Sequence, residues 1–368
     1  MKKSVLFVLV IIYGFSASAC RARNETQEGA AGQTRIVTDV WGREVVIPAT
    51  VRSIITLGSG APRIAAYLDV MDMLVGAEEY DTRDLVVIRD YHPVHHDLFL
   101  TLPVVGSGGG SGNNNGFPEE IIMAAPDVIL AGFDREAADE LQAQTSIPVV
   151  SVRHSTGLAP PDFYEAMRVF AEVVGAQDRC EMILSFMDAS LEDLNRRTSG
   201  IPDSQKLSAY AGAVTWNGRR GIAGTYSVFG IFDAINALNV AHDANIPGFF
   251  LADLESIVVW DPDIIFLDPG NMDLVNGEYA VSPGFFNSLR AVREGRVYTM
   301  PAFNFAGTNF TYAFINAYYA GIVLFPEQYA DVDIADKAVE ILTLFLGMNT
   351  YDIMAGGGLY YGTITIGR

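Results

Sequence analysis

A short pattern occurs twice in this chain and limits the folds open to it. Residues 119–132 read EEIIMAAPDVILAG, and residues 255–269 read ESIVVWDPDIIFLDP. In each copy a Pro-Asp pair (126–127 and 262–263) ends an apolar helical face, and an apolar strand follows. The pattern predicts two similar α/β lobes. A chance likeness between two helix–strand units is the alternative.

Further strands are predicted from short apolar runs along the chain. Several of these runs have apolar residues at successive positions, which is typical of strands covered by helices on both faces. The predicted strands are 35–38, 44–47, 54–57, 104–106, 128–131, 149–152, 207–211, 264–267 and 297–300.

The segment between the two copies has helical periodicity. Phe163, Met167 and Phe170 lie on one face of a helix, Gly175 interrupts it, and the spacing resumes over 177–198 as one helix of about 33 Å. We therefore expect an α/β fold of two Rossmann-like lobes joined by one long interdomain helix. The expected bounds are 35–160 for the N-terminal lobe, 161–198 for the helical backbone and 199–368 for the C-terminal lobe.

The first twenty residues have the layout of an export signal. Lys2 and Lys3 precede an apolar stretch at 5–15, and four small residues lead to Cys20. We expect residues 1–20 to be a lipoprotein signal, with Cys20 acylated as the mature N-terminus, and 21–34 to be a flexible tether. The alternative is an ordinary cleaved signal with a chance cysteine. The expected location is the periplasm or extracytoplasmic face, with the protein attached to the membrane.

Charge excludes one class of partner. The formal net charge of −20 leaves no basic stripe to neutralise phosphates, so we expect no nucleic-acid partner. The second cysteine, Cys180, lies on an apolar helical stripe and is expected to be a buried, unreactive thiol.

Seven segments match a known protein family in their order and spacing, namely 52–59, 65–76, 102–106, 119–129, 237–241, 260–267 and 286–298. Together they resemble the cluster of periplasmic binding proteins for vitamin B12, ferric siderophores, haem and some metal ions. The resemblance implies a solute-binding protein that feeds an ABC importer and catalyses no reaction. Residues 216–218 and 325–329 look closest to a subgroup of iron-complex binders.

The resemblance also implies how the protein docks on its permease. Family members commonly carry one glutamate at the tip of each lobe, but the matching positions here hold Arg63 and Gly230. Asp69, Asp72 and Asp233 lie nearby in the sequence and could replace those glutamates. We expect a monomer in contact with the permease.

Ligand-binding loops are expected where strands end. In the N-terminal lobe these are the turn with Ser59 and Gly60 and the glycine-rich segment 106–116 with Ser107, Gly108 and Gly109. Exposed amides in such loops can bind an oxyanion or carboxylate. The segment lacks the Lys-Ser/Thr ending of a nucleotide-phosphate loop. Ordinary surface turns are the alternative.

A histidine-rich segment offers a metal site. Residues 91–97 read YHPVHHD, so Tyr91, His92 and His95 could contact a metal or a metal-containing ligand. An exposed polar loop without a ligand is the alternative.

In the C-terminal lobe, aromatic and polar residues again follow predicted strands. Tryptophan stacks on flat ligands, and arginine pairs with carboxylates. The candidate ligand contacts are Trp216, Arg219, Arg220, Tyr226, Asn271, Phe303 and Asn304. Packing at a strand end is the alternative for each.

The expected function is capture and delivery of an iron complex, namely a siderophore, haem or corrinoid-like chelate. The alternatives are a bare transition metal, a metal oxyanion such as molybdate or tungstate, and, more remotely, an exported two-lobe enzyme. The sequence has no Gly-x-Ser-x-Gly, His-Glu-x-x-His or Cys-x-x-Cys motif, and we expect neither catalytic residues nor a cofactor.

Overall fold

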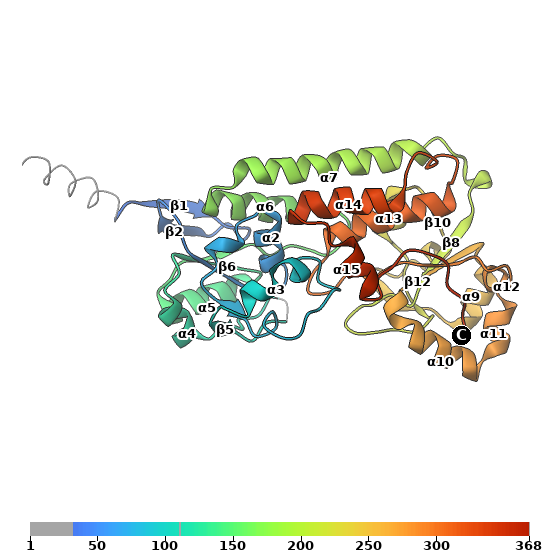
Figure 1. Cartoon of the computed structure of the whole chain (residues 1–368), viewed down its shortest axis with the longest axis horizontal. Helices are drawn as coiled ribbons and strands as arrows, with labels where there is room; N and C mark the ends of the chain where they lie inside the picture. The colour runs from blue at the N-terminus through green and yellow to red at the C-terminus, as the bar shows by residue number, and fades with distance from the viewer. Residues whose placement is uncertain (1–31, 110–111, 368) are drawn as a thin grey trace, which may run out of the picture.

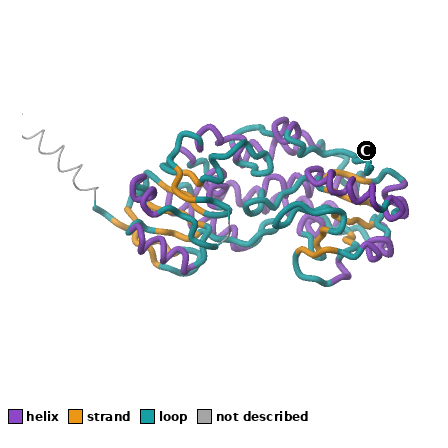
Figure 2. Tube along the Cα trace, turned by 90° about the horizontal axis from the view of Figure 1, so that it is seen from below, coloured by secondary structure: helices purple, strands orange, loops and turns teal. Residues whose placement is uncertain are grey.

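The computed structural model describes residues 32–109 and 112–367, which form two α/β lobes side by side (Figure 1). The predicted signal, Cys20 and most of the tether lie outside the described residues. Strands gather in two groups toward opposite ends of the molecule (Figure 2). Helix α7 (Gln177–Thr198) runs along both lobes, so the predicted fold class is confirmed.

The N-terminal lobe is built on parallel strands. Strands β3, β6 and β7 form one sheet, and the β4–β5 pair joins its edge, where the Val75 amide donates to the Ile54 carbonyl at 3.0 Å. Strands β1 and β2 form an antiparallel hairpin. The elements are β1 (Thr34–Thr38), β2 (Glu44–Pro48), β3 (Ile54–Leu57), α2 (Ala61–Tyr67), η1 (Met71–Met73), β4 (Ala77–Glu78), α3 (His92–Phe99), β5 (Val104–Gly106), α4 (Pro118–Ala124), β6 (Val128–Ala131), α5 (Arg135–Thr145) and β7 (Val149–Ser151).

The C-terminal lobe has a four-stranded parallel sheet in the order β10-β8-β12-β13 and an antiparallel pair, β9 and β11. Its elements are η2 (Asp203–Gln205), β8 (Ser208–Gly212), β9 (Gly224–Tyr226), α8 (Gly230–Ala234), β10 (Leu238–Asn239), η3 (His242–Ala244), β11 (Phe249–Leu251), α9 (Leu254–Trp260), β12 (Ile264–Leu267), η4 (Pro269–Asn271), α10 (Met272–Val281), α11 (Pro283–Ser288), α12 (Arg290–Arg293), β13 (Val297–Thr299), α13 (Phe310–Leu324), α14 (Ile334–Leu346) and α15 (Tyr351–Gly356).

The repeated sequence pattern corresponds to the same unit in each lobe. Helix α4 leads into β6 and α9 leads into β12, and each strand lies inside a parallel sheet. Ile121 and Ile257 are fully buried at matching helix positions, whereas Met123 and Val259 are 83% and 82% exposed. This agreement in buried and exposed faces confirms that the two lobes share a repeated unit.

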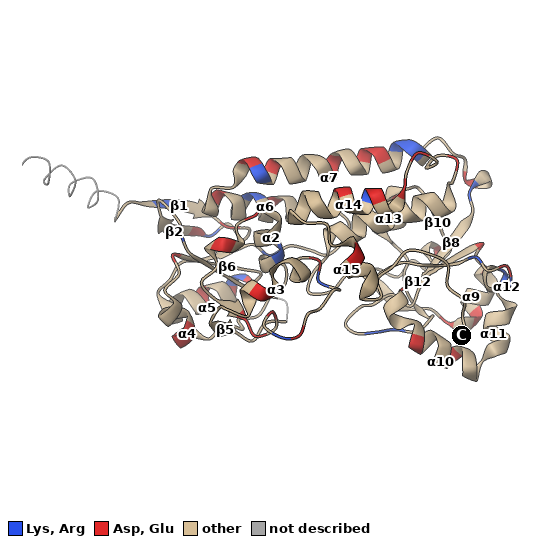
Figure 3. Ribbon diagram, in the orientation of Figure 1, with Lys and Arg blue, Asp and Glu red and all other residues tan. Residues whose placement is uncertain are grey.

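The helical backbone begins with α6 (Pro161–Val174), where Pro161 occupies the first helical position and needs no amide partner. Gly175 ends α6 in a left-handed conformation with φ of 81°, and α7 begins two residues later. Acidic residues lie along α7, and the basic residues lie toward its two ends (Figure 3). Glu181 of α7 pairs with Arg168 of α6 at 2.8 Å. The sequence-predicted bounds of this long helix are confirmed.

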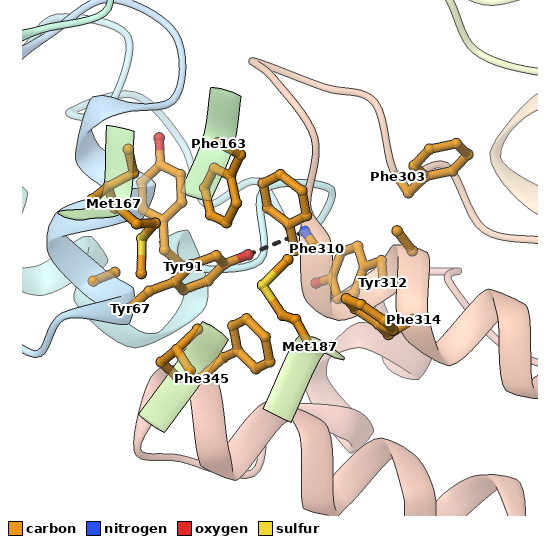
Figure 4. Close-up of a cluster of buried hydrophobic side chains, with 14 of the residues drawn as sticks. Tyr67, Tyr91, Phe163, Met167, Met187, Phe303, Phe310, Tyr312, Phe314 and Phe345 are labelled. Atoms are coloured by element: carbon orange, nitrogen blue, oxygen red, sulfur yellow. Dashed lines mark hydrogen bonds between the residues drawn. The ribbon is translucent and has the colours of Figure 1, made fainter. Parts of the chain in front are cut away.

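One apolar cluster runs through both lobes. It includes Ile54 and Leu130 from the N-terminal sheet, Phe266 from the C-terminal sheet and Phe345 from α14. Figure 4 shows its aromatic centre, where rings from α2, α6, α13 and α14 meet. The ring centroids of Phe163 and Phe310 lie 3.8 Å apart. The lobes are therefore joined by shared packing as well as by α7, which was not predicted from the sequence.

Cys180 lies in this cluster and is 1% exposed. Burial raises the pKa of its thiol to about 11, which keeps the sulfur protonated and unreactive. Among the described residues, no helix is both long enough and apolar enough to cross a bilayer.

Candidate ligand-binding site at the seam between the lobes

The carboxyl ends of the parallel strands carry loops toward the region where the lobes meet, called here the seam. The seam consists of the loops at 58–60, 78–80, 106–109, 152–158, 213–221, 268–271 and 300–309. Because ligands of open α/β sheets bind beyond the carboxyl ends of strands, this is where a shared site is expected.

In the N-terminal lobe the first seam loop is held close to the sheet. Gly58 and Gly60 have φ of 74° and 95°, and a Cβ on Gly60 would lie 2.7 Å from Nε2 of His154. The Gly58 amide donates to Oε1 of Glu78 at 2.7 Å. The glycines are therefore required by the backbone path and the close neighbours.

Glu78 accepts hydrogen bonds from both glycine loops. Besides the Gly58 amide, its Oε1 accepts from Nδ2 of Asn115 at 2.9 Å. The side chain is 3% exposed, and burial raises the pKa of this carboxyl to about 8. Because a neutral carboxyl adds no repulsion, this loop arrangement is compatible with an anion nearby.

The glycine-rich loop lies directly against Tyr80. A Cβ on Gly108, whose φ is 74°, would come within 2.3 Å of the Tyr80 Cβ. Ser107 is exposed, and its amide donates to the Asn115 carbonyl at 3.0 Å. Ser107 and Gly108 therefore belong to the seam, and Gly109 follows them with open space where a Cβ would be. Their contact with a ligand stays a prediction.

Tyr80 also contacts the opposite lobe. Its ring stacks on Phe305, with centroids 6.3 Å apart and planes 24° apart, and the Arg89 guanidinium lies 4.4 Å from the Tyr80 ring centroid. Of these two aromatic residues, Tyr80 was not predicted from the sequence, whereas Phe305 belongs to the segment after the predicted strand 297–300 that was expected to complete the pocket. The signal was present for both, since Tyr80 follows β4 and Phe305 follows β13, but β4 was too short to recognise.

The C-terminal side of the seam contains a cavity of about 260 Å³ with no charged side chain in its lining. Four of the predicted contacts line it, namely Trp216, Tyr226, Phe303 and Asn304. The remaining lining residues are Thr156, Gly157, Leu158, Val228, Phe229, Gly230, Ile231, Gly248 and Phe249.

Aromatic rings dominate this cavity. Trp216 and Phe249 each meet the Tyr226 ring edge-on, at centroid distances of 6.1 and 5.8 Å. Phe229 stacks on Tyr226 at 5.7 Å. A second pocket of about 10 Å³, the size of one water molecule, shares the walls Phe229 and Phe303.

The two predicted arginines do not line the cavity. Arg219 binds its own lobe, donating from Nε to Asn271 Oδ1 at 3.0 Å and from Nη2 to the Gly270 carbonyl at 2.7 Å, and it pairs with Asp273. Arg220 donates to the carbonyls of Arg219 and Asn217. Each guanidinium donates to nearby groups of its own lobe, and Arg220 lies 5.7 Å from the ring centroid of the cavity residue Phe249. The pairing of these guanidiniums with a ligand stays a prediction.

Asn271 is likewise a structural residue. It is 1% exposed, and its Nδ2 donates to the Ala213 carbonyl at 2.7 Å and to Thr215 Oγ1 at 2.9 Å. Burial raises the pKa of neighbouring Asp268, although hydrogen bonds from Thr215 and Gly270 oppose the shift. The prediction that Asn271 contacts ligand is corrected.

The histidine-rich segment forms helix α3, and its first side chains are buried inside the N-terminal lobe. His92 is fully buried, its Nδ1 accepts from the Val86 amide at 3.0 Å, and its Nε2 lies 2.9 Å from the Asp81 carbonyl. Burial lowers the pKa of His92 to about 4, so the ring is neutral. Tyr91 is 3% exposed and donates to Asp81 Oδ1 at 2.9 Å.

These contacts correct the prediction that Tyr91 and His92 bind ligand. Both side chains already have partners inside the lobe. His95 lies half-buried on the same helix. Within residues 32–109 and 112–367, no three His, Cys, Asp or Glu side chains come together as a metal site.

The two positions matched to docking glutamates are not both on the surface. Arg63 is 1% exposed, and Gly230 lines the aromatic cavity. Asp69, Asp72 and Asp233 are exposed. Arg63 therefore does not lie at the exposed tip of its lobe, as its match to a docking glutamate implied, because loop 303–309 of the other lobe covers it.

Comparison with known proteins settles the family. A model described as "Periplasmic binding protein" matches residues 54–302, which include strands of both lobes. The chain belongs to the periplasmic binding protein family. It is the solute-binding, non-enzymatic component of an ABC importer and acts on the periplasmic or extracytoplasmic side.

A curated relative matches most of the chain. The molybdate-binding protein MolA of Haemophilus influenzae is 25% identical over an alignment of 333 residues, and the match covers 83% of this chain and 88% of the relative.

Two solved structures show the same fold. A periplasmic solute-binding protein from Veillonella parvula has a TM-score of 0.68 at 19% identity and covers 89% of this chain and 97% of its own. The molybdate-bound MolA structure has a TM-score of 0.65 at 20% identity and covers 86% and 98%.

Proposed function

We propose that this binding protein captures a small metal oxyanion of the molybdate type at the seam and delivers it to its importer. The observation that carries the proposal is the similarity to a molybdate-binding protein over both lobes and 83% of the chain. This replaces the iron complex expected from the sequence as the first candidate.

The side chains and backbone groups at the seam fit an oxyanion better than a bare metal ion. His92 is already hydrogen-bonded at both ring nitrogens, and the described residues contain no group of three metal-binding side chains. A tetrahedral oxyanion needs hydrogen-bond donors to offset its lost hydration. The Gly58 and Ser107 amides already donate inside the N-terminal lobe. The proposed donors are therefore the other amides of the glycine loops, the Ser107 hydroxyl and Asn304 Nδ2, which also donates to the Tyr226 hydroxyl at 3.4 Å.

The proposed position of the oxyanion lies between the glycine loops and segment 303–307. Phe305 stacks on Tyr80, against which Gly108 lies, and a Cβ on Gly307 would be 3.7 Å from Gly60 Cα. These contacts bring Asn304 and the glycine loops to the same part of the seam.

An iron chelate is the second candidate. The observation that favours it is the aromatic cavity of about 260 Å³, because flat ligands stack on Trp and Tyr rings. Such a ligand would require the cavity walls Trp216 and Tyr226 for its affinity, whereas an oxyanion would not.

Calorimetric titration of the purified protein separates these functions. We expect saturable one-to-one binding of molybdate and tungstate, much weaker binding of sulfate and no binding of a ferric catecholate chelate. Binding of the chelate alone would overturn the oxyanion proposal, and binding of neither would exclude both ligand classes tested.

We also propose that Cys20 carries a lipid and that the exposed carboxylates Asp69, Asp72 and Asp233 contribute to docking on the permease. Substituting Cys20 with Ser is expected to move the protein from the membrane fraction to the soluble fraction. Retention of the C20S protein in membranes would contradict the anchor.

A further inference from the structure

Arg63 lies fully inside the molecule and contacts both lobes. It belongs to α2 of the N-terminal lobe, and its Nε donates to Oδ1 of Asp90 at 2.9 Å in the same lobe. Both residues are at most 1% exposed. Their pairing satisfies one edge of the guanidinium and leaves the other nitrogens directed at the C-terminal lobe.

Those nitrogens bind a single segment of the C-terminal lobe. Nη1 donates to the Ala306 carbonyl at 2.8 Å, and Nη2 donates to the Phe305 carbonyl at 3.2 Å and to Asn309 Oδ1 at 2.8 Å. A planar guanidinium holds its donors in a fixed fork, so the three acceptors are fixed relative to one another.

Asp90 extends the same network. Its Oδ2 accepts from Tyr67 and, at 2.8 Å, from Thr311 Oγ1, while its amide donates to Asn309 Oδ1 at 2.9 Å. The Tyr67 hydroxyl in turn accepts from the Phe310 amide at 3.1 Å, the contact drawn as a dashed line in Figure 4. Segment 305–311 is thus bound to the N-terminal lobe at both of its ends.

This segment directly follows two residues that line the candidate cavity. Phe303 and Asn304 line the cavity, and Phe305 stacks on Tyr80. Gly307 reaches the network with φ of 86°, and a Cβ there would lie 3.1 Å from Arg63 Nη1. Releasing the segment would leave a buried guanidinium with unpaired donors, which is strongly unfavourable.

We propose that Arg63 is a positioning residue for ligand binding, fixing segment 303–309 of the C-terminal lobe against the N-terminal lobe so that the seam is preformed before ligand arrives. A preformed site avoids the ordering cost that a mobile loop would add to binding. The effect on affinity rests on the proposed function, whereas the ordering of the segment does not.

Hydrogen exchange of the ligand-free protein tests the proposal, comparing Arg63→Met and Arg63→Lys with wild type. We expect exchange in the peptide covering 303–309 to accelerate at least about tenfold in R63M and less in R63K, which keeps one charged donor. Unchanged exchange in R63M would overturn the proposal.

Arg179→Met is the matched control. Arg179 of α7 donates to the carbonyls of Tyr67 in α2, at 3.0 Å, and of Phe345 in α14, at 3.3 Å, so it joins elements of both lobes without touching segment 303–309. We expect R179M to lower thermal stability while exchange at 303–309 stays as in wild type. Equal acceleration in R179M and R63M would reduce Arg63 to a general stabilising role and overturn the proposal.

Gly307→Ala tests the contact from the loop side and serves if R63M does not fold. The added methyl group separates the loop from Arg63 but keeps the buried ion pair. We expect the same local acceleration in G307A and, with tungstate as probe, at least about tenfold weaker binding. Normal exchange in G307A would contradict the positioning role. Accelerated exchange without tungstate binding by wild type would refute the ligand assignment alone.

Discussion

Asp127 of the N-terminal lobe and Asp263 of the C-terminal lobe make the same hydrogen bonds in their respective lobes. Each carboxylate accepts from the backbone amide of a serine at the start of the neighbouring strand, Ser53 at 3.1 Å and Ser208 at 2.9 Å. Each Asp amide also donates to that serine's hydroxyl, at 3.1 and 3.0 Å. Each Pro-Asp pair in the sequence therefore marks the same hydrogen-bonded junction between two strands, once in each lobe.

We predict that Asp127→Ala and Asp263→Ala each lower the free energy of unfolding by about 1–3 kcal/mol, because each leaves amides without their acceptor. Since the sites lie in different lobes, the two losses should add. Urea denaturation of the single and double variants measures this. Glu119→Ala, on the exposed side of α4, is the control and should cost little. If only one of the two variants lost unfolding free energy, the two Asp–Ser junctions would not be equivalent.

Glu78 should make stability depend on pH. Burial raises its pKa from 4.5 to about 8, so the folded protein holds a proton that the unfolded chain releases. Protonated Glu78 contributes its full share to the free energy of unfolding below pH 4.5. That contribution is lost as pH rises through about 8, and the free energy of unfolding falls by up to about 1.4 kcal/mol per pH unit. Glu78→Gln should remove that loss, so the variant gains stability over wild type toward pH 9.

Unfolding experiments between pH 5 and 9 check this prediction, using the difference between variant and wild type so that Asp81 and other groups cancel. Glu79→Gln alters the adjacent exposed carboxylate and is the matched control. A difference that stays flat over this range would mean that Glu78 is ionised in the folded protein.

Side chains around the cavity should contribute unequally to oxyanion affinity. Asn304→Ala removes an amide that lines the cavity, and we predict about tenfold weaker molybdate binding. The double change Arg219→Ala and Arg220→Ala should alter affinity by less than about threefold, because both guanidiniums bind their own lobe. Sharp loss of binding in the arginine variant, measured by calorimetry, would place these residues in the site.

The strands were predictable where apolar runs were long enough. All nine predicted strands are present, with small shifts such as β8 beginning at Ser208 instead of Leu207. The strands missed are β4, β9, β10 and β11, which have two or three residues each. Length is not the whole reason, because the three-residue β5 was predicted from its adjacent Val104 and Val105. None of the four missed strands contains adjacent Val or Ile residues, so only pairing with neighbouring strands defines them.

The binding site was less predictable, because chemistry read from residue type does not show which way a side chain points. His92 suits a metal by composition, yet both ring nitrogens bind the backbone inside the lobe. Tyr80 and Phe305 come together only because segment 303–309 folds back onto the N-terminal lobe. Arg63 was misplaced for the same reason, since its cover comes from the other lobe.

Anomalous diffraction from crystals grown with tungstate tests the central claim most directly. We predict a single strong tungsten peak at the seam, between the glycine loops at 58–60 and 106–109 and segment 303–307, with amide or hydroxyl donors around it. A peak elsewhere in either lobe, or none at saturating tungstate, would contradict the account.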